Sequence, residues 1–528
     1  MARSDEKPTD QATTLGRRSF LGGVGAGLVG AAAGPLLLNN VEALAETVEG
    51  PVTSAAPDPR FSRMFNLPAF ADPRSSAVRA AMTEIGRPGG IMDARDPLNE
   101  GPIRLITNPE LSPRNLDQSV ANMTAGTTFV GQFLDHDITF DAVSALGVVT
   151  EPTATRNTRD ARLDLDAVYG GGPTVSPQLY QSTDNAKFIV ETGGLFEDVP
   201  RNSNRTAIIA ERRNDENLMI SGLHAAFLLA HNRTVDFRRA NGQTADVWFL
   251  SRRTIIHHWQ WLIVHEFLPQ IVGQALVNDI MNNGLRWYRF NAPTIPVEFQ
   301  TGTYRFGHSL VRPSYRANLA GNPDGTPFFG FIFDPAGQGQ SDPVDLRGGA
   351  RARRRFIGWQ TFFDFGGAQT TNVRPNKRID THISTPLFNL PLAAIASGDP
   401  PTSLPARNLL RHLTWSLPSG QRIAAATGSP VLASSNFPEL RPFNLGLDAS
   451  TPLWYYILRE AEVFNNGVRL GPVGGRIVAE TIIGLLRMDE FSYLNNGFTP
   501  TLPRQNASTF TMTDMLRWAR VDPASRGQ

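Results

Sequence analysis

Two long helical patterns in the middle of the chain constrain its fold more than any other feature. Apolar residues recur at helical spacing across residues 214–240 and again across residues 244–273. Asp215 and Glu216 fall in the first turn of the first pattern, where the helix dipole favours acidic side chains. Pro269 and the final glycine are typical of the end of the second pattern. We therefore expect two long helices here.

The rest of the sequence predicts shorter helices joined by long loops. Strand-like alternation is scarce, and there is no internal repeat or low-complexity boundary among the 528 residues. Residues 142–200 and 285–355 are rich in glycine and other loop formers. Further helical patterns cover residues 118–135, 402–414, 453–464 and 473–487. We predict a mainly α fold with little β: one large helical domain at residues 76–528, after an extended Pro- and Ala-rich arm at residues 46–75.

The N-terminus has the layout of an export signal. Arg17 and Arg18 precede a Gly- and Ala-rich apolar run, which ends in "ALA" at residues 43–45. This layout predicts a twin-arginine signal peptide at residues 1–45, and therefore a periplasmic or extracellular protein. A membrane anchor is the weaker alternative, because the run is short and broken by Pro35. No later stretch approaches the ~20 apolar residues that span a bilayer.

Composition excludes several classes of function. The net charge of +1 gives no reason to expect a nucleic-acid partner. The absence of cysteine excludes disulfides, thiolate metal sites and a cysteine nucleophile.

The stretch "GQFLDHDITFD" at residues 131–141 places charged groups in an apolar helical context. On a helix, Gln132, Asp135 and His136 share one face, because they are three and four residues apart. Asp137 points about 100° away from His136 and would serve a different site. By itself, such an Asp-His pair is more often a structural contact than a functional one.

A second charged stretch is "DARLDLDAVYGGG" at residues 160–172. Asp160, Asp164 and Asp166 lie close together in it, and carboxylates with backbone carbonyls suit a hard cation such as calcium. Asp137 would add a ligand from the preceding helix. A solvated acidic loop explains this segment equally well.

Two further motifs carry polar groups. In "ERRNDEN", Arg213 and Glu216 are three residues apart and would face one pocket, although a surface ion pair is the simpler account. In "YRFGHSLVRP", His308 follows a glycine among aromatic residues, where a neutral imidazole would suit a metal. Other histidines on the predicted helices are assigned to packing or capping: His224, His231, His257, His258 and His265.

The order and spacing of these motifs, followed by "RNLLRHLTWSLPSGQ" at residues 407–421, resemble the animal-type haem peroxidase family. This family includes myeloperoxidase, lactoperoxidase and the peroxinectins, and it has bacterial members. The resemblance runs from Phe65 to Arg520 and is most specific in "GQFLDHDITF" and "LDLDAVYGG". It implies the family's helical fold.

The resemblance implies roles for five residues around the peroxide-binding face of a haem. His136 would be the distal histidine, Arg213 the distal arginine and Gln132 the distal glutamine. The implied cofactor is haem b. Asp135 and Glu216 match the carboxylates that form ester bonds with haem in mammalian members, so the residues needed for ester linkage are present.

On the opposite face, the resemblance implies that His308 is the proximal iron ligand. Asn408 would hydrogen-bond the imidazole of His308, and Arg305 would pair with a haem propionate. Asn217 stands where myeloperoxidase has a methionine that forms a third link to haem, so the resemblance does not imply efficient chloride oxidation.

The resemblance also implies a Ca²⁺ site. Asp137, Asp160, the carbonyl of Arg162, Asp164 and Asp166 match its ligands. The family usually has threonine at the position of Asp160 and often serine at that of Asp166, so this site would carry more carboxylates.

The implied function is a secreted peroxidase that reduces H₂O₂ through an oxoferryl intermediate and oxidises a halide, thiocyanate or phenol-like donor. One alternative is a fatty-acid dioxygenase of the same superfamily. Cyclooxygenases have a tyrosine three residues before the proximal histidine, whereas this chain has Arg305 there and Tyr304 one residue off. A second alternative is an adhesion or matrix protein like the peroxinectins.

Overall fold

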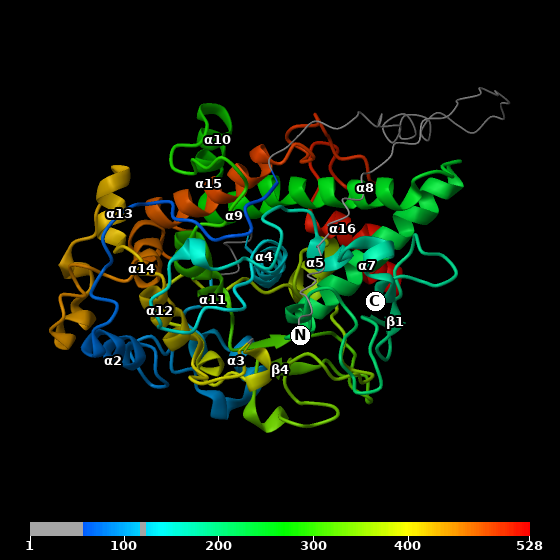
Figure 1. Ribbon diagram of the computed structural model, residues 1–528. Helices are drawn as coiled ribbons and strands as arrows, with labels where there is room; N and C mark the ends of the chain where they lie inside the picture. The colour runs from blue at the N-terminus through cyan, green and yellow to red at the C-terminus, as the bar shows by residue number, and fades with distance from the viewer. Residues whose placement is uncertain (1–55, 117–122, 396) are drawn as a thin grey trace, which may run out of the picture. The chain divides into compact units, whose positions relative to one another are not determined.

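The computed structural model of the protein describes residues 56–116, 123–395 and 397–528, and the predicted signal peptide lies outside them. Its helices are α2 Ser76–Ile85, α3 Gly101–Thr107, α4 Ala125–Ile138, α5 Asp166–Tyr169, α6 Gly172–Val175, α7 Leu218–Ala240, α8 Val247–Leu262, α9 Leu268–Val272, α10 Gln274–Asn283, α11 Gly307–Leu310, α12 Leu404–Thr414, α13 Gly420–Thr427, α14 Leu453–Asn465, α15 Pro472–Met488, α16 Met512–Trp518 and α17 Pro523–Arg526 (Figure 1). The strands are β1 Glu191–Thr192, β2 Glu197–Asp198, β3 Ser314–Arg316 and β4 Phe329–Phe331, and they form two antiparallel pairs. The predicted mainly α fold with long loops is confirmed.

The long helix α7 begins four residues later than predicted. Arg212–Asp215 forms a separate 3₁₀ turn (η5), in which the Glu211 carboxylate accepts a hydrogen bond from the Arg213 amide. Asn217 then caps α7, because its side chain accepts a hydrogen bond from the Ile220 amide. The prediction that Asp215 and Glu216 lie in the first turn of this helix is therefore wrong. Both precede α7.

Pro269 does not end the second long helix. After α8, residues Ile263–Phe267 form a π-helical turn, and α9 continues from it. Pro269 is the second residue of α9, directly after the π-helical turn, and the helix continues through it although proline has no N–H to donate. The helix ends at Gly273, whose φ of 87° is accessible to glycine without strain.

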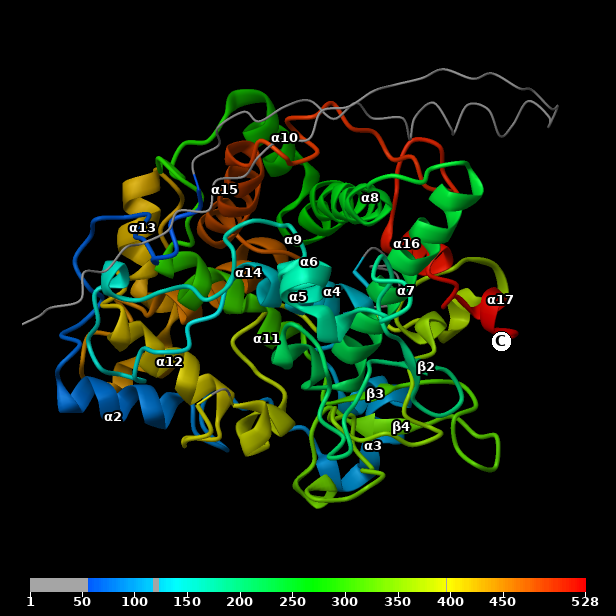
Figure 2. The same ribbon diagram turned by 45° about the vertical axis from the view of Figure 1, so that its right-hand side comes forward.

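Helix α4 lies between α7 and α11 in both views of the fold (Figures 1 and 2), and it contacts both. Its apolar residues pack into the core, where Phe133 is fully buried and stacks on Phe227 of α7 at 4.9 Å between ring centroids. Predicted from residue 118, the helix begins at Ala125; residues 117–122 lie outside the described part. This packing fixes the position of the charged residues at the end of α4.

The described part of the N-terminal arm, residues 56–75, contains no helix and is anchored by buried phenylalanines. Phe61 lies 5.8 Å from Trp415 and Phe65 lies 5.7 Å from Trp287, measured between ring centroids. The arm therefore belongs to the packed core. Among the described residues, no helix is long and apolar enough to cross a membrane.

Candidate active site

A cavity of about 210 Å³ lies beside α4 and α11. His136 of α4 and His308 of α11 both line it, as do Arg213 and Glu216 from the segment that precedes α7. Apolar side chains such as Phe129 form the remaining walls. The tertiary fold thus brings three separate sequence motifs to one cavity.

The polar residues near the end of α4 lie on two sides of the helix. Gln132, Asp135 and His136 line the cavity, as the helical spacing predicts. Asp137 is fully buried on another side, where its carboxylate accepts hydrogen bonds from the amides of Leu165 at 3.2 Å and Ala167 at 3.5 Å. The direction that helical geometry predicts for Asp137 is the one observed.

His136 is buried, and its Nδ1 lies 2.8 Å from Oδ1 of Asn214. Burial, followed by the positive charge of Arg213, lowers the pKa of His136 to about 3. The imidazole is therefore neutral at ordinary pH. Its Nε2 forms no hydrogen bond with any described residue.

Arg213 is held rigidly beside His136. Its guanidinium donates to both carboxylate oxygens of Glu211, and to the carbonyls of His136 at 3.2 Å and Thr139 at 2.9 Å. It also stacks on Phe140, 4.4 Å from the ring centroid. Burial alone would lower the pKa of Arg213, but Glu211 raises it, so the group stays cationic.

Two carboxylates lie at the edge of the cavity. Asp135 has one oxygen 3.7 Å from the Arg213 guanidinium, and its other oxygen is buried without a hydrogen-bond partner among the described residues. Burial raises the pKa of Glu216 to about 8, against the opposing effect of Arg213. Gln132 donates to Glu216 and accepts from Asn217, each at 3.3 Å, so its carboxamide is oriented from both ends.

On the α11 side, Nδ1 of His308 lies 2.7 Å from the carboxamide of Asn408, which belongs to α12. Burial, followed by the charge of Arg305, lowers the pKa of His308 to about 3. Arg305 uses its Nε to donate to the Gln300 carbonyl at 2.8 Å, whereas its terminal nitrogens form no hydrogen bond with described residues. His308, Asn408 and Arg305 therefore lie together, as their motifs predict.

A second cavity of about 520 Å³ shares Arg213 and Arg305 with the first. Its charged lining is mainly cationic, with Arg79, Arg212, Arg407 and Arg411 added to these two.

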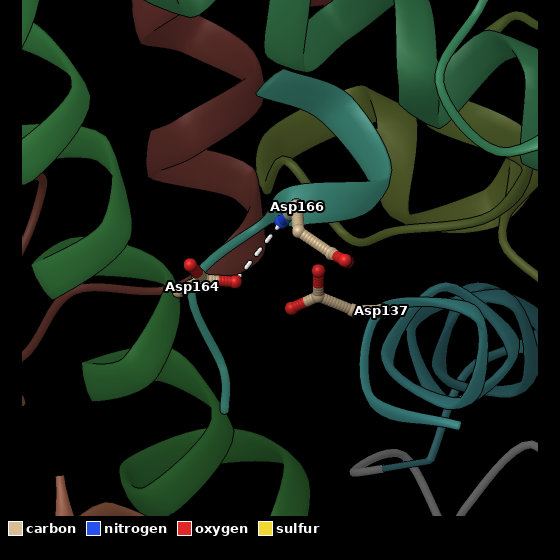
Figure 3. A group of neighbouring side chains, drawn as sticks. All are labelled: Asp137, Asp164 and Asp166. Atoms are coloured by element: carbon tan, nitrogen blue, oxygen red, sulfur yellow. Dashed lines mark hydrogen bonds between the residues drawn. The ribbon is translucent and has the colours of Figure 1, made fainter. Parts of the chain in front are cut away.

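The acidic loop lies on the other side of α4. Carboxylate oxygens of Asp137, Asp164 and Asp166 come within 4.8 Å of one another. Figure 3 shows Asp137 projecting from α4 toward Asp166, while Asp164 receives a 3.1 Å hydrogen bond from the Asp166 amide. Burial raises the pKa of Asp137, with further increases from Asp166 and then Asp164. Burial likewise raises the pKa of Asp166 to about 7.

One residue expected in this group, Asp160, has its carboxylate outside it. The carboxylate of Asp160 does not belong to the group of three; it lies 4.0 Å from the Arg162 guanidinium, while the Asp160 amide donates to Asp166. The guanidinium of Arg162 lies 3.9 Å from Asp489, and the role of its carbonyl as a ligand stays a prediction. Burial, followed by the charge of Asp164, raises the pKa of Asp160 to about 6.

Sequence reasoning missed Asn214 and Glu211, which hold His136 and Arg213 in place. Both lie in the "ERRNDEN" motif and both are buried. His224, assigned to packing, forms a hydrogen bond with Asn214. The sequence did contain a signal for both: Glu211 and Asn214 are polar residues on either side of Arg213, in the segment that leads into a helix.

Comparisons with known proteins find one sequence family and several similar folds. Residues 144–335 match the animal haem peroxidase family. Peroxidase A from Dictyostelium discoideum has a similar structure, with a TM-score of 0.58 and 16% identity, covering 88% of this chain and 93% of its own. Fatty acid alpha-dioxygenase from Oryza sativa is also similar, with a TM-score of 0.53 and 13% identity over 77% of this chain and 73% of the rice chain.

No curated protein sequence matches the chain. At the identities above, the structural similarities establish the fold, whereas the match at residues 144–335 is one of sequence. Together they confirm the resemblance found in the sequence motifs: residues 144–335 match the animal haem peroxidase family, and the chain has the helical fold of the animal peroxidases.

Proposed function

We propose that the protein is an exported haem peroxidase that reduces H₂O₂ and oxidises a halide, thiocyanate or phenol-like donor. One observation carries the proposal. His136 and His308, from different helices, line one cavity as neutral imidazoles. Each has Nδ1 beside a carboxamide and Nε2 without a hydrogen bond to any described residue.

The residues present fit a haem. His308 would hold the iron through Nε2, because a neutral imidazole is a good ligand for iron. Arg305 would pair with a propionate, since its terminal nitrogens have no partner among the described residues. Apolar walls such as Phe129 and Phe267 suit the porphyrin faces. When bound, haem supplies the two-electron redox chemistry that peroxide reduction requires.

Asn408 would fix the orientation of His308. With iron on Nε2, the proton of the imidazole is on Nδ1, so the partner must accept it. A carboxamide presents its oxygen after a half-turn, and no other described group holds the side chain of Asn408 against that turn. This hydrogen bond would make His308 a more basic ligand.

His136 and Arg213 would act on the peroxide. The neutral imidazole of His136 takes a proton from one peroxide oxygen and delivers it to the other, which leaves as water. The fixed charge of Arg213 stabilises the negative charge that develops on the leaving oxygen. Gln132, oriented by Glu216 and Asn217, would hydrogen-bond water or a small anion beside them.

Ca²⁺ is the second cofactor of the proposal, held by Asp137, Asp164 and Asp166. The support is the convergence of three carboxylates and the raised pKa values of Asp137 and Asp166. A divalent cation relieves the repulsion between carboxylates that lie close together in a buried site.

Two substitutions test the peroxidase proposal. His308→Ala should abolish the Soret band, because the iron ligand is lost. His136→Ala should keep haem but react with H₂O₂ about 10²–10⁴-fold more slowly in stopped-flow measurements, the usual range for general acid–base catalysis. His231→Phe is the matched control, since His231 is buried but lines neither cavity. Normal haem uptake by His308→Ala would contradict the ligand assignment.

Similarity to the rice alpha-dioxygenase makes oxygen chemistry the competing function. The Tyr304 hydroxyl donates to the Gly131 carbonyl at 3.1 Å beside the cavity. Oxygen uptake with linoleate in the absence of H₂O₂ would overturn the peroxidase proposal. Turnover of bromide, iodide, thiocyanate or phenols with H₂O₂ supports it and identifies the donor class.

A further inference from the structure

Asn214 is a fully buried side chain held between two histidines. Its Oδ1 lies 2.8 Å from Nδ1 of His136 on α4, and its Nδ2 lies 3.1 Å from Nδ1 of His224 on α7. Asn214 itself belongs to the 3₁₀ turn η5, where its amide donates to the Glu211 carbonyl at 3.0 Å. The carboxamide therefore links η5, on which Asn214 lies, to α4 and α7.

The two ends of a carboxamide have opposite hydrogen-bonding roles. The oxygen can only accept, so Nδ1 of His136 must carry a proton. A neutral imidazole has one N–H, so Nε2 of His136 then has a free lone pair. The nitrogen of Asn214 can only donate, so Nδ1 of His224 accepts and the proton of His224 is on Nε2. One arrangement of protons satisfies both hydrogen bonds as the structure places them.

We propose that Asn214 is a positioning residue that holds His136 in the tautomer able to accept a proton from H₂O₂. This inference rests on the proposed peroxidase function. If the carboxamide were reversed, Asn214 would donate to His136, and the single proton of the imidazole would lie on Nε2. His136 would then be unable to act as a base.

His224 opposes this reversal. Because His224 holds the other end of the carboxamide, turning Asn214 requires both imidazoles to change tautomer together. His224 is buried on α7 and lies outside both cavities, so it contacts no part of the proposed site except through Asn214. Its contribution to the reaction is therefore indirect.

Substitution of Asn214 tests the proposal. Asn214→Leu has similar volume but cannot accept from His136, and the rate constant for reaction with H₂O₂ should fall about 10–10³-fold, since loss of a tautomer-fixing acceptor lowers the activity of a histidine base strongly in other enzymes. The separate variant Asn214→Asp keeps an oxygen acceptor, and its rate constant should lie within about fivefold of the wild-type value. Asn214→Ala, which adds no bulk, is measured beside them.

Haem content and stability separate positioning from simple structural support. The Soret absorbance of the Asn214 variants should equal that of the wild type. Asn318→Leu is the matched control: Asn318 is also fully buried, it donates to the carbonyls of Arg354 and Phe356, and it lines neither cavity. Asn318→Leu should lower the melting temperature and leave the H₂O₂ rate unchanged. Equal rates in the Leu, Ala and wild-type forms of position 214 would overturn the proposal.

A double-mutant cycle tests the path through His224. His224→Phe should slow the reaction by roughly threefold to tenfold, because Asn214 loses the partner that fixes its orientation. Combining His224→Phe with Asn214→Leu should be no slower than Asn214→Leu alone, since both act through one carboxamide. Additive losses would contradict a shared path.

The binding of cyanide to the ferric protein gives a readout that does not depend on turnover. HCN must lose a proton when it binds, so its association rate should fall in Asn214→Leu and recover in Asn214→Asp. His136→Ala distinguishes a failure of the base assignment from a failure of the positioning role. If the wild type does not react with H₂O₂, the proposed function is wrong. If His136→Ala leaves the H₂O₂ rate unchanged, the assignment of His136 as the base is wrong, and the positioning role of Asn214 is wrong with it. If His136→Ala is slow and every Asn214 variant is fast, only the positioning role is wrong.

Discussion

At the scale of single residues, Asp135, His136 and Asp137 are consecutive but lie in three different surroundings. Asp135 lies near the Arg213 guanidinium, His136 is bonded to Asn214, and Asp137 accepts hydrogen bonds from loop amides. A helix turns about 100° per residue, so Asp135 and His136 line the cavity at different points while Asp137 faces away from it. Each side chain can therefore take a separate task without competing with the next.

Asp135 and Glu216 are expected to become covalently linked to haem when H₂O₂ is supplied. One oxygen of Asp135 is buried without a partner among the described residues, and both side chains line the cavity. After peroxide treatment, extraction with acidic organic solvent should leave haem on the wild-type polypeptide. The double variant Asp135→Asn, Glu216→Gln should release it. Complete release from the treated wild type would contradict the prediction.

The residues that face the cavity from α4 were predictable, because helical spacing alone determines them. Asn214 was not predictable. Its partners are His136, 78 residues earlier, and His224, 10 residues later, and only the packing of α4 against η5 and α7 brings them together. Asp160 was assigned to the cation site from its place in the loop, but the loop turns its carboxylate toward Arg162.

At the scale of elements, α4 connects the cavity with the acidic loop. His136 and Asp137 are adjacent on its last turn, so an ion bound at Asp137 would restrain the end of the helix that carries the proposed base. Arg159 forms a further connection, lying 3.6 Å from Asp166 and 3.4 Å from Glu211, the residue that holds Arg213.

Ca²⁺ is expected to raise the melting temperature through the group of three carboxylates. Binding to the folded state alone stabilises by about 2.7 kcal/mol at a free concentration 100 times Kd. Asp137→Asn should abolish this increase, measured by thermal unfolding in Ca²⁺ and in chelator. Asp160→Asn is the control and should keep most of it, because the Asp160 carboxylate lies outside the group. Equal responses of the two variants would contradict the assignment.

Buried histidines join helices to neighbouring elements. His258 on α8 donates through Nδ1 to the Thr254 carbonyl at 2.7 Å, and its Nε2 accepts from the amides of Thr501 and Leu502, both at 3.0 Å. His412 on α12 makes the same kind of link to Trp454. These hydrogen bonds require a neutral ring, because a protonated Nε2 cannot accept.

Acid should therefore destabilise the protein through His258. Burial lowers its pKa from 6.5 to about 3, so the unfolded chain takes up a proton first as the pH falls. The stabilisation is fully present above pH 6.5 and is lost between 6.5 and about 3; between pH 7 and 5 this amounts to about 2 kcal/mol. Denaturant unfolding of the wild type and His258→Leu should show a difference that shrinks over this range. A constant difference would contradict the prediction.

At the scale of the whole molecule, the family match covers only part of the site that the fold assembles. The family match at residues 144–335 includes Arg213 and His308 but not His136 or Asn408. The tertiary structure brings these four residues into one site.

Export of the folded protein is expected to depend on Arg17 and Arg18. Substituting both by lysine should leave the precursor in the cytoplasm, because the twin-arginine route requires the pair. Cell fractionation checks this, and sequencing of the exported protein should find its N-terminus after Ala45. Normal export of the lysine variant would contradict the signal assignment. A fusion of residues 1–50 to a reporter is the control for effects on folding.

The sequence alone determined the mainly α fold, the residues of α4 that share one face, and the separate direction of Asp137. These properties follow from the fixed geometry of the helix and require no knowledge of distant contacts. The tertiary structure decided where α7 begins, which carboxylates converge, and which carboxamide meets which imidazole. His308 and Asn408 are 100 residues apart, and such pairs depend on how whole elements pack. A buried polar side chain takes its role from the partner that packing provides, and that partner cannot be inferred from local spacing.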